Sequence, residues 1–109
     1  MTKFSTHRFQ GRLVPSYIIG DNVVFVDDIV FGEIPLKCGY PFRASVFIND
    51  NKCAELINNA DGASSSIYCI PSDKDARDKL FAIMKQIRDH DKENKNIESV
   101  CDKLINSYN

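Results

Sequence analysis

Cysteine and histidine are the side chains of this sequence that could bind a metal ion or act as a nucleophile and its base. A structural zinc site usually takes cysteines two to four residues apart. The cysteines here are 15, 16 and 32 positions apart: Cys38, Cys53, Cys69 and Cys101. Free cysteine packs as a small apolar side chain, so we expect core cysteines and neither a metal ion nor any other cofactor.

A nucleophilic enzyme would need a cysteine or serine beside an oriented base. His7 lies near the N-terminus and His90 in a charged stretch, and neither setting predicts a buried imidazole. A Cys69–His90 pair formed by the fold stays open as an alternative. Adjacent side chains of a strand point to opposite faces, so Asp27 and Asp28 would not converge on one substrate. The sequence therefore predicts a protein that is not an enzyme and has no catalytic residue.

The charge balance argues against a dedicated nucleic-acid binder. The chain has 109 residues, 14 Lys plus Arg against 15 Asp plus Glu, and a net charge of −1. Nucleic-acid binders normally carry a basic excess, because neutralised phosphates drive their affinity. Only local asymmetry remains: residues 1–12 are basic without an acid, and residues 21–33 are acidic without a base. We interpret them as a basic N-terminal arm and an acidic hairpin that could dock, with ordinary solvated surface as the alternative.

The pattern of turn residues divides the chain near Pro71 into a strand-rich front and a helical back. The back contains no Gly or Pro after Pro71, which indicates an α+β fold with segregated elements. We expect one domain over residues 1–109, with an antiparallel sheet of about four to five strands and two C-terminal helices packed on one face. The expected strands are 16–19, 23–26 (continuing to 31 as an option), 42–48, 53–57 and 65–70.

Both helices are predicted from apolar side chains that recur at helical spacing. Ser72 is the expected N-cap of the first helix and Asn96 that of the second. The almost wholly charged stretch 89–95 should separate them. The predicted buried positions are Ala76, Leu80, Ile83, Met84 and Ile87, then Ile97, Val100, Cys101, Leu104, Ile105 and Tyr108.

Aromatic and arginine side chains are the usual anchors of protein interfaces. Phe47 lies on the more polar face of strand 42–48, and the small residues of loop 58–66 allow close approach of a partner. The predicted partner-binding residues are Lys3, Arg8, Arg12, Asp27, Asp28, Arg43, Phe47 and Asp61. Direct nucleic-acid contact through Lys3, Arg8, Arg12 and Arg43 is one alternative, and self-association through the helical face is another. The oligomeric state is left open.

The sequence also bears on location. Residues 1–10 are polar, and no run approaches the ~18 apolar residues of a membrane span. We therefore expect a cytoplasmic protein with free thiols that does not enter a membrane.

Residues 44–68 follow a pattern of strand, Asn-containing turn ending in Lys, strand, Asn and Gly loop, and Tyr. Its elements are residues 44–48, Asn49 with Lys52, residues 54–57, Asn59 with Gly62, and Tyr68. This segment resembles small accessory proteins of phages and mobile elements, and it departs from them at Asp50, Asn51 and Ala63, where Gly is usual. The resemblance implies an inhibitor of the anti-CRISPR or anti-defence kind, which occludes a surface of a host protein or nucleoprotein complex. It assigns no functional residue.

Overall fold

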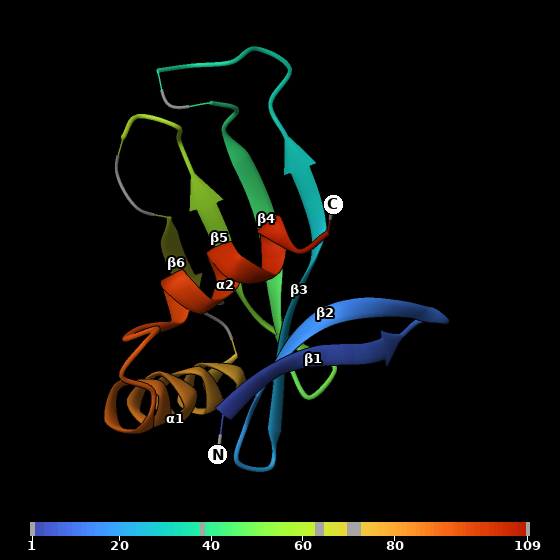
Figure 1. Cartoon of the computed structure of the whole chain (residues 1–109), viewed down its shortest axis with the longest axis vertical. Coiled ribbons are helices and arrows are strands. Elements are labelled where there is room, and N and C mark those ends of the chain that lie inside the picture. Colours follow the sequence, from blue (N-terminus) through green and yellow to red (C-terminus); the bar gives the residue numbers. More distant parts are fainter. Residues whose placement is uncertain (1, 38, 63–64, 70–72, 109) are drawn as a thin grey trace.

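Each strand of the sheet pairs with its neighbours in the sequence, and two helices follow the sheet (Figure 1). The computed structural model describes residues 2–37, 39–62, 65–69 and 73–108, so the predictions for Cys38 and Ser72 lie outside the described residues. Within these ranges the α+β fold is confirmed, with six strands in place of four to five. The elements are β1 (Thr2–Phe9), β2 (Arg12–Ile19), β3 (Asn22–Phe31), β4 (Phe42–Ile48), β5 (Asn51–Asn58), β6 (Ser66–Cys69), α1 (Lys74–His90) and α2 (Ile97–Asn106).

The basic N-terminal arm expected over residues 1–12 is wrong, because Thr2–Phe9 is a strand. β1 pairs with β2 along its whole length, from Thr2 opposite Ile19 to Phe9 opposite Arg12. Gln10 and Gly11 join the two strands with φ values of 50° and 77°, as a two-residue hairpin turn requires. The N-terminal segment is therefore an edge strand of the sheet.

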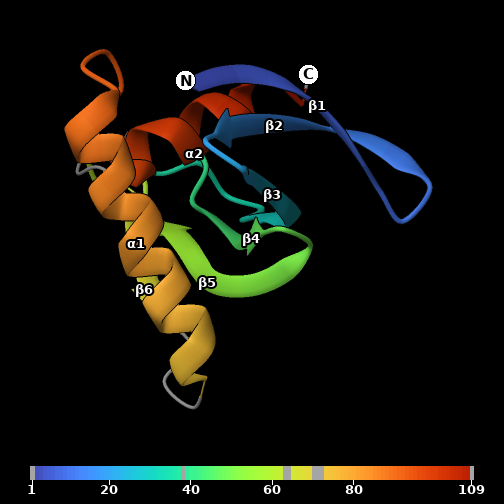
Figure 2. The ribbon, with the colours of Figure 1, turned by 90° about the horizontal axis from the view of Figure 1, so that it is seen from below.

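One face of the sheet packs against both helices and forms the main core (Figures 1 and 2). α1 contacts β5, β2 and β6, and α2 contacts β3 and β2. Their apolar stripes are buried at the predicted positions, among them Leu80, Ile83, Ile87, Val100 and Leu104, while Met84 is half-buried and Tyr108 exposed. The apolar faces of the helices, which we considered for self-association, therefore pack on the sheet.

The opposite face carries a second, smaller core, and the β1–β2 hairpin supplies part of it. Pairing of β2 with β3 ends at Ser16, next to Pro15, which lacks an amide hydrogen. Beyond this point the hairpin diverges from the sheet and projects away from the body (Figure 2). Its Phe9 and Val14 pack with Phe25 and Phe47. Phe47 is only 8% exposed, so the hairpin covers most of the side chain that we predicted to contact a partner.

Two polar residues cap the helices. Asp73 accepts a hydrogen bond from the amide of Ala76 at 3.0 Å and begins α1. Asn96 accepts one from the amide of Ser99 at 2.8 Å and begins α2, as predicted. Across the described ranges, neither helix is long and apolar enough to cross a membrane.

Candidate interaction surface

Arg12 and Asp27, two predicted contact residues, are bound to each other. Arg12 Nη2 lies 2.5 Å from Asp27 Oδ2, and Arg12 Nη1 donates to Asp27 Oδ1 at 3.3 Å. Asp27 is buried on β3, while Arg12 comes from the hairpin. The forked geometry is the strong form of this ion pair. Both charges are therefore engaged in holding the hairpin to the sheet.

The remaining predicted cations do not gather into one basic surface. Lys3 and Arg8 are five positions apart on β1 and so point to opposite sides of the hairpin. Arg8 reaches the carbonyl of Gly11 at the hairpin tip. Arg43 is exposed on β4 beside Val30. Lys3 and Arg8 therefore do not face one ligand together, and the charge of Arg12 is already paired with Asp27.

The two remaining predicted acids are exposed and far apart along the chain. Asp28 has a φ of 52° and occupies a bulge, where the pairing of β3 with β4 shifts between Asp27 and Val30. Asp tolerates this left-handed conformation better than most residues. Asp61 lies in the bend after β5; residues 63–64 of its loop lie outside the described residues. The structure thus brings Asp28 near the Arg12–Asp27 pair and places Asp61 in a different loop.

A surface that sequence reasoning missed lies at the end of the sheet where β3 leads into β4. Five large apolar side chains within residues 30–40 are 52% to 72% exposed: Val30, Phe31, Ile34, Leu36 and Tyr40. We call these five residues the apolar end. Val30 and Phe31 fall in segment 21–33, predicted to dock; the others fall in a stretch predicted only as a loop. The loop forms the top of the view in Figure 1.

A hollow of about 280 Å³ opens beside the apolar end. Its walls come from Phe31, Tyr40 and Phe42 on one side and from Ile105 and Tyr108 on the other. The Tyr108 hydroxyl donates to the carbonyl of Val26 and ties the end of the chain to β3. Burial, followed by the charge of Asp27, raises the pKa of Tyr108 to about 12. The hydroxyl therefore stays protonated at neutral pH and remains a hydrogen-bond donor.

Short backbone bonds hold the loop of the apolar end closed on itself. The amide of Gly32 donates to the Pro41 carbonyl at 2.8 Å, and that of Leu36 to the Gly39 carbonyl at 2.6 Å. A Cβ atom on Gly32 would lie 2.8 Å from Pro41 Cγ, so this close approach requires glycine. These bonds close the loop without directing its apolar side chains into the core. They remain available to a partner.

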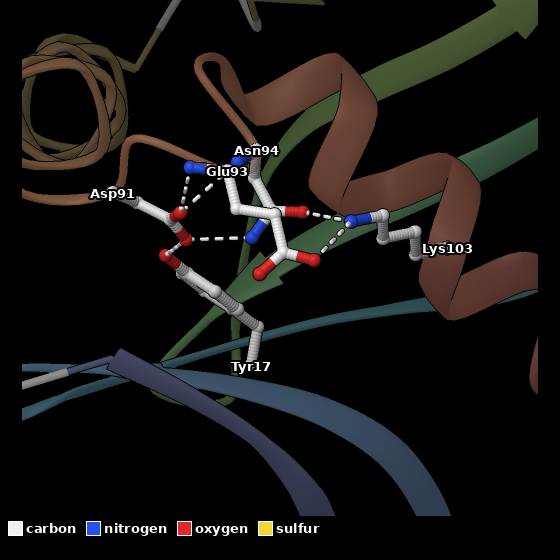
Figure 3. Close-up of polar contacts among 5 residues, drawn as sticks. All are labelled: Tyr17, Asp91, Glu93, Asn94 and Lys103. Atoms are coloured by element: carbon white, nitrogen blue, oxygen red, sulfur yellow. Dashed lines mark hydrogen bonds and ion pairs between the residues drawn. The ribbon is translucent and has the colours of Figure 1, made fainter.

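A buried polar network joins the end of α1 to β2 (Figure 3). Asp91 Oδ2 accepts hydrogen bonds from the Tyr17 hydroxyl at 2.5 Å and from Asn94 Nδ2 at 2.6 Å. Asp91 Oδ1 accepts from the amides of Glu93 and Asn94 at 3.1 and 3.0 Å. Lys103 of α2 donates to Asn94 Oδ1 at 2.5 Å. The stretch 89–95, predicted as a charged separator, therefore contains a buried cap.

The hydrogen bonds on Asp91 determine its ionisation. Burial raises the pKa of this carboxyl, but the bonds from Tyr17, Asn94 and Glu93 outweigh burial and lower it to about 2. A carboxylate with so low a pKa is a poor proton acceptor at neutral pH. The geometry therefore favours a structural role for Asp91.

This lowered pKa predicts how stability depends on pH. The folded-state pKa of about 2 lies below the ordinary 3.8. The ionised Asp91 thus stabilises the fold fully above pH 3.8, and this contribution is lost as pH falls toward 2. Urea unfolding at a series of pH values should show the loss in the wild type and a smaller one in Asp91→Asn. Equal acid dependence of the two proteins would contradict this account.

Cys53, Cys69 and Cys101 are free cysteines, and His7 contacts an acid. Cys53 and Cys101 are buried, and burial raises the pKa of both thiols. Cys69 is half-buried, and His7 Nε2 lies 2.7 Å from Asp50 Oδ1. Across residues 2–37, 39–62, 65–69 and 73–108, no three His, Cys, Asp or Glu side chains are grouped to hold a metal ion.

Comparison with known proteins finds no relative of this chain. No family model, no curated protein and no solved structure matches the chain.

Proposed function

We propose that this chain is a non-enzymatic binding protein that docks on another protein through its apolar end. Five exposed large apolar side chains at one end of the sheet carry the proposal, and two of them, Phe31 and Tyr40, line the hollow. Large exposed apolar patches are rare on soluble monomers and mark interaction sites. Phe31 and Tyr40 are of the residue types enriched at interfaces, and the adjoining hollow would accept an anchoring side chain of the partner.

The charges around the apolar end favour a protein partner over a nucleic acid. The exposed ionisable residues that lie near the apolar end in sequence carry charges of both signs: Asp28, Glu33, Lys37 and Arg43. Phosphate binding needs a basic excess, whereas a mixed polar rim around an apolar centre is typical of protein interfaces. The alternative of nucleic-acid binding through Lys3, Arg8, Arg12 and Arg43 has less support, because Arg12 is paired with Asp27.

The resemblance of residues 44–68 leads us to propose a more specific partner. In this proposal the chain acts in the cytoplasm as a phage or mobile-element inhibitor of the anti-CRISPR kind. The partner is then a protein subunit of a host nucleoprotein defence complex, and inhibition results from occlusion of its surface. The apolar end would supply the occluding contact.

Polar substitution in the apolar end should abolish binding. We expect Phe31→Ser/Ile34→Ser to weaken capture of the partner at least about tenfold, because the loss of two interface anchors costs more than 1.4 kcal/mol. The measurement is a tagged pull-down from bacterial lysate, with and without nuclease, read by mass spectrometry. A titration with the purified partner follows.

Leu13→Ser provides the matched control. Leu13 is 64% exposed on the β1–β2 hairpin, away from the apolar end. We expect it to retain one nuclease-resistant partner at near-unit stoichiometry. Recovery of nucleic acid alone, or equal capture by the control and the double variant, would rule out docking through the apolar end. A dimer that Phe31→Ser/Ile34→Ser dissolves would instead assign this surface to a second copy.

A further inference from the structure

A groove with a different chemistry lies between α1 and the start of α2. Its volume is about 330 Å³, and its lining includes Phe81, Met84, Lys85, Arg88, Lys95 and Ile97. The first four come from one face of α1, since positions three, four and seven apart lie together on a helix. In Figure 1, α1 lies at the bottom of the view and the β3–β4 loop at the top. The groove is therefore a surface separate from the apolar end.

The floor of the groove is apolar. Phe81 is 51% exposed although it is a large aromatic residue, Met84 is half-buried and Ile97 is fully buried. Phe81 and Met84 thus offer partly exposed apolar surface inside a concave site. Concave sites with an apolar lining and a few polar groups are the usual form of binding sites.

The rim of the groove is cationic. Lys85, Arg88 and Lys95 line it, and none of the described residues in its lining is an Asp or Glu. Arg88 contacts Asp89 at 3.4 Å. Within the part of the chain that the structure describes, Lys85 and Lys95 have no carboxylate within ion-pair distance. Lys95 also adopts a φ of 68° in the turn before α2, which is uncommon for a residue other than glycine. Three positive charges therefore surround one apolar floor.

We propose that this groove binds a short acidic segment of a protein. Carboxylates of the segment would pair with Lys85, Arg88 and Lys95, and one apolar side chain between them would contact Phe81 and Met84. The positive charges lie in this one groove, so they match a short occupant. A nucleic-acid strand needs a continuous positive track along its phosphates. Here two acids, Asp89 and Glu98, flank the cations in sequence and interrupt such a track. The charge of the groove and its apolar floor thus fit an acidic, amphipathic peptide.

The test uses the full-length protein labelled with ¹⁵N and a synthetic peptide of sequence Asp-Glu-Leu-Phe-Glu-Asp. We expect one-to-one binding, with amide shift changes concentrated in the second half of α1 and the first turn of α2. Lys85→Glu/Arg88→Glu should lower the affinity at least about tenfold, because two attractions become repulsions. Raising the salt concentration should weaken binding as well, since ions screen exposed charges.

Lys79→Glu/Arg77→Glu is the matched control, with the same charge change on the same helix but outside the groove lining. It should keep the affinity within about twofold of the wild type. An equal loss in both double variants, or shift changes located elsewhere, would overturn the proposal. So would the absence of binding, or binding of an oligothymidine in place of the peptide. Phe31→Ser/Ile34→Ser should still bind the peptide, which separates this site from the apolar end.

Discussion

Phe25→Ala is expected to lower the free energy of unfolding by about 4 kcal/mol. Phe25 is fully buried although it lies on the face of the sheet that no helix covers. Its ring is stacked on Phe47 at 5.0 Å and lies 4.8 Å from Phe9 and 5.2 Å from His7. Truncation leaves a cavity among these rings and removes one of the contacts between the hairpin and the sheet. Urea unfolding at neutral pH measures the change.

Leu13→Ala is the control for this experiment, because Leu13 belongs to the same hairpin and is exposed. This substitution should lower the free energy of unfolding by no more than about 0.5 kcal/mol, as for most surface substitutions. Phe25→Leu, with an expected loss of about 1.5 kcal/mol, provides a second measurement if the alanine variant does not fold. Costs for the Phe25 variants no larger than that of Leu13→Ala would show that the hairpin does not cover this face in solution.

Asp91→Ala should destabilise the protein by about 3 kcal/mol. The carboxylate accepts four hydrogen bonds and caps the end of α1. Its removal takes one hydrogen-bond acceptor from the buried Tyr17 hydroxyl and one from the buried Asn94 side chain. Unsatisfied buried donors cost more than the net gain of forming the bond. Thermal and urea unfolding should both report the loss.

Two further variants separate the network from a general charge effect. Asp89→Ala, an exposed acid two residues earlier, should cost about 0.5 kcal/mol or less. Tyr17→Phe should cost about 1 kcal/mol. Since Tyr17 and Asp91 are bonded to each other, their double variant should lose less than the sum of the single losses. Strict additivity would show that this hydrogen bond does not form in solution.

Local patterns were sufficient for much of this fold. The expected strand 42–48 is β4 with its observed bounds. The Asn-containing turn that follows it has φ values of 51° and 69° at Asn49 and Asp50. Asn96 is recognisable as a cap because its side chain needs only an amide three residues away. Such features depend on neighbours in the chain, so the sequence carries them directly.

β1 could not be predicted in this way, because its stability depends on β2. Phe4 and Phe9 are an odd number of positions apart, so no alternation marks one apolar face. The strand forms through backbone pairing with β2 over its full length. Of the basic residues that suggested an arm, Lys3 and Arg8 are exposed positions of this edge strand, and Arg12 belongs to β2 and pairs with Asp27.

The residues of the candidate site were harder to predict than the strands, because their exposure depends on tertiary structure. Asp91 lies in a charged stretch, and its buried role comes from Tyr17, which is 74 positions away. The sequence predicts Phe47 on the surface, but in the structure the β1–β2 hairpin covers it. Conversely, Ile34 and Leu36 are apolar residues whose exposure follows from the loop closing on itself. Residue type alone cannot separate these cases, because the partner that buries a side chain comes from elsewhere in the chain.

The sequential strand order also has a consequence for synthesis on the ribosome. Each strand finds its partner in the chain segment made just before it, so the sheet can form hairpin by hairpin with little loop entropy to overcome. The aromatic cluster of Phe9, Phe25 and Phe47 is complete once β4 has emerged. The opposite face must wait for α1 and α2, which follow the sheet in the chain. The nascent chain thus exposes one apolar face until both helices have left the exit tunnel.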